Sequence, residues 1–126
     1  MSRFSSSIDP DRMAQVVTNL VGNAIRATDP GGSITVLCRP DGRGTLLSVT
    51  DTGVGLDADE FEKVFERFHR AEGSRRGDGS GVGLTIARGI VEAHGGTITA
   101  SSEGRGLGST FTVRLPAPNR GLSTPR

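Results

Sequence analysis

The sequence predicts one α+β domain, a two-layer sandwich in which helices pack on a sheet. Two observations indicate this class. The expected elements run helix, two strands, helix, helix, two strands, which places each strand beside its neighbour in a hairpin. The chain has 126 residues, 33% of them hydrophobic, and 19 glycines without a repeating period, which favours one modest core with many loops.

The first predicted helix begins after Asp9 and stops at the turn 29–32. Asp9 is a good N-cap, Pro10 suits the first helical position, and Asp11 lies at the positive end of the helix dipole. Apolar residues recur at helical spacing and should face the core: Met13, Val16, Val17, Leu20 and Ala24. A second stripe of the same helix carries three polar residues: Asn19, Asn23 and Arg26.

Residues 33–39 and 45–50 alternate as strands around a turn at 40–44, and 97–101 and 110–115 are expected to form a second hairpin. Between the hairpins, Asp57 and Glu60 form a capping-box-like start to a short helix. Its buried stripe would be Phe61, Val64, Phe65 and Phe68. The next amphipathic helix buries four residues and ends at 94–96: Leu84, Ala87, Ile90 and Val91.

Three segments lack an apolar pattern. Residues 71–80 are polar and glycine-rich and are expected to be mobile, and residues 117–126 are expected to form a disordered tail. Residues 1–8 are expected to be flexible or to form a residual edge strand. The folded domain would therefore span 9–116.

Charge and composition exclude several classes of protein. A net charge of +1 gives no reason to expect nucleic-acid binding. The single cysteine, Cys38, excludes an internal disulfide and fits a reducing compartment. No apolar stretch approaches the ~20 residues that cross a bilayer, and the N-terminus lacks an apolar signal core. We therefore expect a soluble, cytoplasmic domain.

Two motifs place polar groups where a nucleotide could use them. In Asn19-Leu-Val-Gly-Asn23-Ala, an Asn carboxamide can donate an oxygen to Mg²⁺ without adding charge beside a triphosphate. Arg26, one turn on, could meet a phosphate. In Asp51-Thr-Gly53-Val-Gly55, a carboxylate at a strand end can accept a hydrogen bond from the exocyclic amine of adenine, while Gly53 and Gly55 let the backbone approach the base. Taken singly, these motifs also fit a solvated helix face and an ordinary turn.

A third motif, Gly79-Ser-Gly81-Val-Gly83-Leu84, lies directly before an apolar helix. Exposed N–H groups and the helix dipole make such a junction an anion site. A flexible linker is the alternative interpretation. Arg70, Arg75 and Arg76 flank the loop; Arg70 is the better phosphate candidate, and the other two are more simply solvated charges.

Together these stretches resemble the N, G1, F and G2 boxes of the ATP-binding catalytic domain of sensor histidine kinases, of the superfamily shared with DNA gyrase B, Hsp90 and MutL. The F box is the stretch from Phe65 to Arg70, and residues 108–116 resemble the family's last strand. The resemblance implies the Bergerat ATP-binding fold, a mixed, mostly antiparallel sheet with helices on one face. It also implies ATP and Mg²⁺ as cofactors.

The resemblance further implies a role for each motif residue. Asn23 would bind Mg²⁺ beside Asn19, Arg26 and Arg70 would contact phosphates, and Asp51 would read the adenine with help from Thr110. The glycines Gly79, Gly81 and Gly83, with Leu84, would wrap the phosphates, and residues 71–80 would form the ATP lid.

Two departures from the family matter, and a third position, Asn19, distinguishes this chain from some members of the superfamily. Ala27 stands where relatives often have an aromatic residue or His, so base stacking should be weaker. The strand before the first helix is absent or reduced to residues 4–8, which leaves an exposed edge. Asn19 replaces the Glu that activates water in gyrase, Hsp90 and MutL, and it is a poor general base, so phosphoryl transfer is favoured over hydrolysis.

The phosphate acceptor is not evident. His69 and His94 both lie outside the family's acceptor context and are interpreted as structural. The chain would therefore need a histidine-bearing dimerisation or phosphotransfer domain or protein, and through it a response regulator. An anti-sigma-factor-type protein-serine kinase and a non-catalytic ATP-dependent interaction module are the alternatives.

Overall fold

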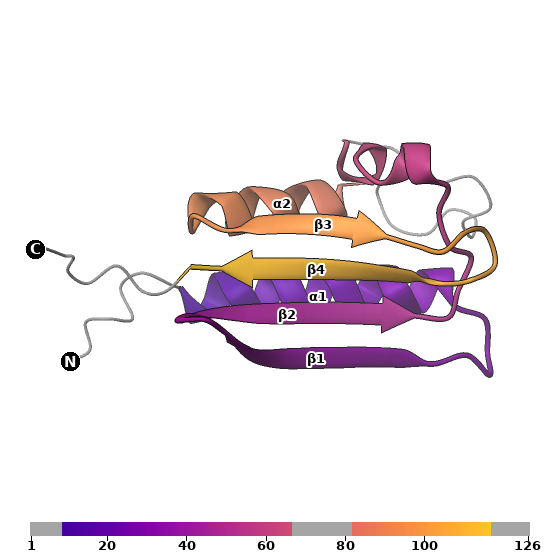
Figure 1. The fold of residues 1–126 in the computed structure, drawn as a ribbon, viewed down its shortest axis with the longest axis horizontal. Coiled ribbons are helices and arrows are strands. Elements are labelled where there is room, and N and C mark those ends of the chain that lie inside the picture. The colour runs from indigo at the N-terminus through magenta and orange to yellow at the C-terminus, as the bar shows by residue number, and fades with distance from the viewer. Residues whose placement is uncertain (1–8, 67–81, 117–126) are drawn as a thin grey trace, which may run out of the picture.

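The computed structural model describes residues 9–66 and 82–116. Four strands form one sheet in the order β1-β2-β4-β3: β1 (Ile34–Asp41), β2 (Gly44–Asp51), β3 (Thr97–Ser101) and β4 (Ser109–Leu115). The helices α1 (Pro10–Ala27) and α2 (Gly83–Ala93) lie behind the sheet in Figure 1. The predicted two-layer α+β sandwich is therefore confirmed. All three pairings between the described strands are antiparallel, in keeping with the mostly antiparallel sheet that was expected.

Helix α1 follows its sequence signals closely. One Asp9 side-chain oxygen, Oδ1, accepts hydrogen bonds from the N–H groups of Asp11 and Arg12 at 2.9 and 3.3 Å, which caps the first turn. Val16, Leu20 and Ala24 are buried, as predicted, and Met13 packs against the core while partly exposed. The helix ends at Ala27, one turn before the predicted Pro-Gly-Gly stop.

The two faces of the sheet differ in chemistry. On the face that the helices cover, Val49 pairs with Phe111 and Ile98 with Val113, and all four residues are buried in the core. The opposite face carries a row of hydroxyl residues across the four strands: Thr35, Thr50, Thr110 and Ser101. Hydroxyls are satisfied by water, so this face needs no second layer of helices.

Strand β1 is one of the two edge strands of the described sheet and is largely exposed. Val36 and Leu37 keep 49% and 47% of their surface accessible. Among the described residues, no strand pairs with the outer side of β1. Residues 4–8, on which the expected edge depends, lie outside the described residues.

The segment after Asp57 differs from the short helix that we predicted. The capping box of Asp57 and Glu60 forms, but the chain then makes two single-turn 3₁₀ helices, η2 (Ala58–Glu60) and η3 (Lys63–Phe65). Tertiary contacts of Phe65 account for this local structure. The Phe65 ring packs edge-on against Phe111 with centroids 6.1 Å apart, and the Thr85 hydroxyl donates to the Phe65 carbonyl oxygen at 2.7 Å. Phe68 lies outside the described residues.

His94 joins the two helices. Its Nε2 accepts a hydrogen bond from the Asp9 N–H at 3.0 Å, and its Nδ1 lies 2.8 Å from the Ile90 carbonyl oxygen. Nδ1 must therefore carry the proton, so the imidazole is neutral and both nitrogens are engaged. This geometry supports the structural interpretation of His94. His69 lies outside the described residues.

Candidate nucleotide-binding site

The fold brings together three of the polar motifs that the sequence indicated. The Val54 N–H donates to the Ala27 carbonyl oxygen at 3.1 Å, which holds the loop after β2 against the end of α1. The Asn19 side-chain Nδ2 donates to the Gly83 carbonyl oxygen at 3.0 Å, which holds α1 against the start of α2. The ends of β2, α1 and α2 are thus joined around one region.

Asp51 is the best-defined polar group of this region. Its residue is only 3% exposed, and its Oδ1 accepts from the N–H groups of Gly53 and Ser109 at 2.8 and 3.2 Å. Its Oδ2 is buried and has no hydrogen-bond partner among the described residues. Burial raises the pKa of this carboxyl above 3.8, and the two backbone hydrogen bonds oppose that shift. A buried acceptor without a donor is the feature that a ligand amine would satisfy.

Gly53 and Gly55 are required by the packing of the chain itself. A Cβ on Gly53 would collide with the Ala27 carbonyl oxygen. Gly55 has φ +72°, and a Cβ there would collide with the Gly104 carbonyl oxygen. The expectation that these glycines also let a nucleotide approach stays a prediction, because the close neighbours in the structure are other segments of this chain.

Thr110 does not lie beside Asp51. The register pairs Asp51 with Ser109 and Thr50 with Thr110, so alternation puts Thr110 on the opposite face of the sheet. There its hydroxyl lies 3.1 Å from that of Thr50. Ser109, which is buried, shares the face of Asp51 and supplies one of its two donors. Strand register, which the sequence motif does not reveal, identifies Ser109 as the residue that we missed.

On α1, the two asparagines differ in their contacts. Asn19 uses its amide nitrogen to contact Gly83. Within the described ranges, Asn23 and Arg26 are half-buried and make no hydrogen bond or ion pair. The described residues include no cluster of three or more His, Cys, Asp or Glu side chains that could hold a metal. The role of the Asn23 side-chain oxygen as a ligand of Mg²⁺, which takes oxygen ligands and retains waters, stays a prediction.

Among the described residues, no side chain caps the start of α2 at Val82, and its first turn contains no acidic residue. Backbone N–H groups near Gly83 and Leu84 can therefore meet an anion. The remaining predicted phosphate contacts, Arg70, Gly79 and Gly81, lie outside the described residues, as do Arg75, Arg76 and the lid at 71–80.

A sandwich with a buried carboxylate oxygen that lacks a partner among the described residues, beside a helix that carries two asparagines, has the features expected of a nucleotide-binding module. The comparison with protein families agrees. The model of the histidine kinase-, DNA gyrase B-, and HSP90-like ATPases matches residues 8–119. This chain belongs to that family, as its motifs indicated.

Similar proteins include sensor histidine kinases. The chain is 44% identical over 114 residues to the sensor protein SrrB of Staphylococcus aureus, covering 89% of this chain and 19% of that protein. The mycobacterial sensor histidine kinase MprB is 32% identical, with a TM-score of 0.80 over 87% of this chain and 76% of that one. Full-length ShkA, crystallised in complex with AMPPNP, is 32% identical with a TM-score of 0.70 over 83% of this chain and 21% of that one.

The chain thus spans about a fifth of the length of the curated relatives that it matches. Within the described ranges, no helix combines the length and apolar character that crossing a membrane requires.

Proposed function

We propose that this chain binds Mg-ATP and donates the γ-phosphate to a histidine on a separate dimerisation or phosphotransfer domain or protein, in two-component signalling. The observation that carries the proposal is the buried, unpartnered Oδ2 of Asp51 at the end of β2. Membership of the ATPase family and similarity to sensor histidine kinases support it. The similar protein ShkA is described in complex with AMPPNP, an ATP analogue, which also favours this ligand class.

The proposed binding mode divides the nucleotide among three elements. Asp51 Oδ2 would accept the exocyclic amine of adenine, a donor that guanine lacks at that position. Asn23 would hold Mg²⁺, which would neutralise phosphate charge, and Arg26 would contact a phosphate. The uncapped N–H groups of α2 would meet the phosphates from the other side.

Transfer is favoured over hydrolysis because the site lacks a general base at Asn19. An amide cannot take a proton from water, and its nitrogen is engaged with Gly83. The chain would therefore position ATP and leave the nucleophile to a histidine from elsewhere. His94 does not fit that role because both of its ring nitrogens are occupied. The phosphohistidine would then supply the phosphoryl group to a response regulator, and the proposed location of this activity is the cytoplasm.

The test uses the chain with γ-labelled ATP and Mg²⁺, with and without a candidate histidine-hairpin protein. Label on the partner that acid removes and base does not would support transfer to histidine. Acid-stable label would instead support the protein-serine kinase. ATP binding without any labelled product, across a set of candidate partners, would support the interaction module.

A further inference from the structure

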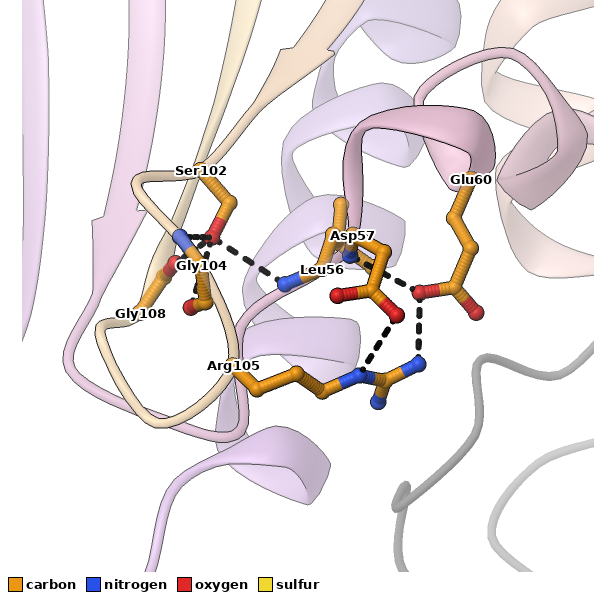
Figure 2. A network of polar contacts seen from close by, with 7 residues as sticks. All are labelled: Leu56, Asp57, Glu60, Ser102, Gly104, Arg105 and Gly108. Carbon is orange, nitrogen blue, oxygen red and sulfur yellow. Dashed lines mark hydrogen bonds and ion pairs between the residues drawn. The ribbon is translucent and has the colours of Figure 1, made fainter.

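The connection between β3 and β4, residues 102–108, is tied along its length to the segment 53–60 that follows Asp51. The Gly106 N–H donates to the Val54 carbonyl oxygen at 2.8 Å. The Leu56 N–H donates to the Ser102 hydroxyl oxygen at 3.0 Å. Figure 2 shows the Ser102 end of this contact and, beside it, the side chain of Arg105. The two segments therefore continue the contact between β2 and β4 beyond the ends of these strands.

Arg105 closes the outer end of this arrangement. Its Nε donates to Asp57 Oδ2 at 3.2 Å, and its Nη2 donates to Glu60 Oε1 at 2.8 Å, as Figure 2 shows. The same Glu60 oxygen accepts from the Asp57 N–H at 3.0 Å, and the Glu60 side chain is only 10% exposed. A planar guanidinium can reach both carboxylates at once, whereas an ammonium is a single point charge. The contact is therefore specific to arginine in geometry as well as in charge.

The inner end of the same arrangement carries both donors to Asp51. Gly53 begins one tied segment and Ser109 follows the other, and their N–H groups both bind Oδ1. The Gly108 N–H donates to the Gly53 carbonyl oxygen at 3.1 Å, which directly links the residue before Ser109 to Gly53. A shift between the segments would therefore change how the carboxylate is held.

We propose that Arg105 is a positioning residue for base specificity: by holding 102–108 against 53–60, it keeps both N–H donors on Asp51 Oδ1 and Oδ2 directed to the base. Arg105 itself touches no nucleotide atom in this assignment. The inference rests on the proposed function, because it takes adenine as the base that Asp51 reads.

The test measures the dissociation constants of ATP and GTP, in magnesium, by titration calorimetry on the whole chain. The wild type should prefer ATP. Arg105→Gln should lower the ratio of the GTP to the ATP dissociation constant by about 2- to 30-fold, the range of couplings carried through intervening residues. Arg105→Lys keeps the positive charge but loses the planar guanidinium that reaches both carboxylates. It should give a ratio between those of the wild type and Arg105→Gln. A purely structural role would lower melting temperature without changing this ratio.

Arg114→Gln is the matched control. It breaks an Arg–Asp ion pair of similar length, 2.9 Å to Asp41, in which Asp41 ends β1 and Arg114 lies on β4, and it should leave the ratio unchanged. If circular dichroism shows that Arg105→Gln is unfolded, Glu60→Gln replaces it, since it removes the charge and keeps the shape.

Each outcome is decisive. A wild type without preference for ATP would overturn the reading of adenine by Asp51, and this inference with it. A wild type that prefers ATP, with an unchanged ratio in the folded Arg105 or Glu60 variant, would overturn only the role of Arg105.

Discussion

Asn19 on α1 donates its side-chain amide to the main-chain oxygen of Gly83, the first residue of α2, at 3.0 Å. The two residues are 64 positions apart, and each belongs to a different nucleotide-binding motif. The hydrogen bond connects the helix that would hold Mg²⁺ with the helix end that would meet the phosphates. Asn19 thus supports the site by joining its two halves.

We expect Asn19→Ala to reduce the free energy of unfolding by about 0.5–1.5 kcal/mol, the net contribution of one such hydrogen bond. Asn19→Asp should reduce it further, because a carboxylate oxygen would face the Gly83 carbonyl oxygen where a donor is now. Both variants should bind ATP more weakly than the wild type. Urea unfolding and ATP titration measure the two effects, and an Asp variant as stable as the wild type would contradict this role.

Asn23→Ala should remove most of the magnesium dependence of ATP binding. Even groups outside the ligand shell contribute about tenfold or more to metal affinity, so the loss of a direct ligand should be at least that large. Titrations with Mg²⁺ and with EDTA give the dependence for each protein. Gln15→Ala, which removes an exposed amide from the same helix, is the control. A variant with the wild-type difference between the two titrations would refute the assignment.

Asp51→Asn should abolish the preference for adenine and weaken ATP binding by about 10- to 100-fold. A hydrogen bond to a charged acceptor contributes about 1.5–3 kcal/mol, which corresponds to that range. The Asn oxygen can still accept from Gly53 and Ser109, so the loss should appear in ATP affinity with GTP affinity little changed. Equal weakening for both nucleotides would instead indicate a general structural defect.

Acidification should weaken ATP binding by the wild type at a higher pH than an ordinary Asp would predict. Burial raises the pKa of Asp51 above 3.8, and the proposed contact needs the ionised carboxylate. Binding is therefore complete above the raised pKa and is lost as the pH falls through it. Calorimetric titrations over the acidic range should show this loss in the wild type and not in Asp51→Asn.

The same shift predicts an opposite trend in the stability of the nucleotide-free protein. Because the folded-state pKa lies above the unfolded value, the native state binds the proton more tightly. The stability due to this group is present below 3.8 and is lost as the pH rises through the raised pKa. The melting temperature of Asp51→Asn relative to the wild type should therefore increase with pH over this window and then level off. A difference that stays constant with pH would contradict the burial of an ionised Asp51.

His94→Ala should lower the free energy of unfolding by about 1–2 kcal/mol, since two hydrogen bonds to backbone groups are lost. ATP affinity should remain within about twofold, because the His94 contacts join Asp9, at the N-terminal end of α1, to the C-terminal end of α2, away from Asp51. Phosphotransfer to an added histidine protein should also persist. Loss of transfer in a folded variant would show that His94 does more than join the helices.

The sequence by itself determined the fold class, the capped first helix, both hairpins and the family, because each depends on local signals or on short motifs. Asp9 followed by Pro10 specifies a helix start whatever surrounds it. Asp51 was also identifiable, because its motif stands in order with the other boxes of the family, although taken singly it fits an ordinary turn.

Tertiary structure alone decided how the site is built. Local spacing predicted a helix near Phe65, but packing against Phe111 and Thr85 produced two 3₁₀ turns. Strand register, which depends on pairing between residues 58 positions apart, put Ser109 and not Thr110 beside Asp51. Any side chain at position 53 or 55 would collide with a carbonyl group of a distant segment, which explains why both positions are glycine. Hydrogen-bond partners and burial depend on how two segments, distant in the sequence, pack together. The sequence of one segment alone therefore cannot predict them.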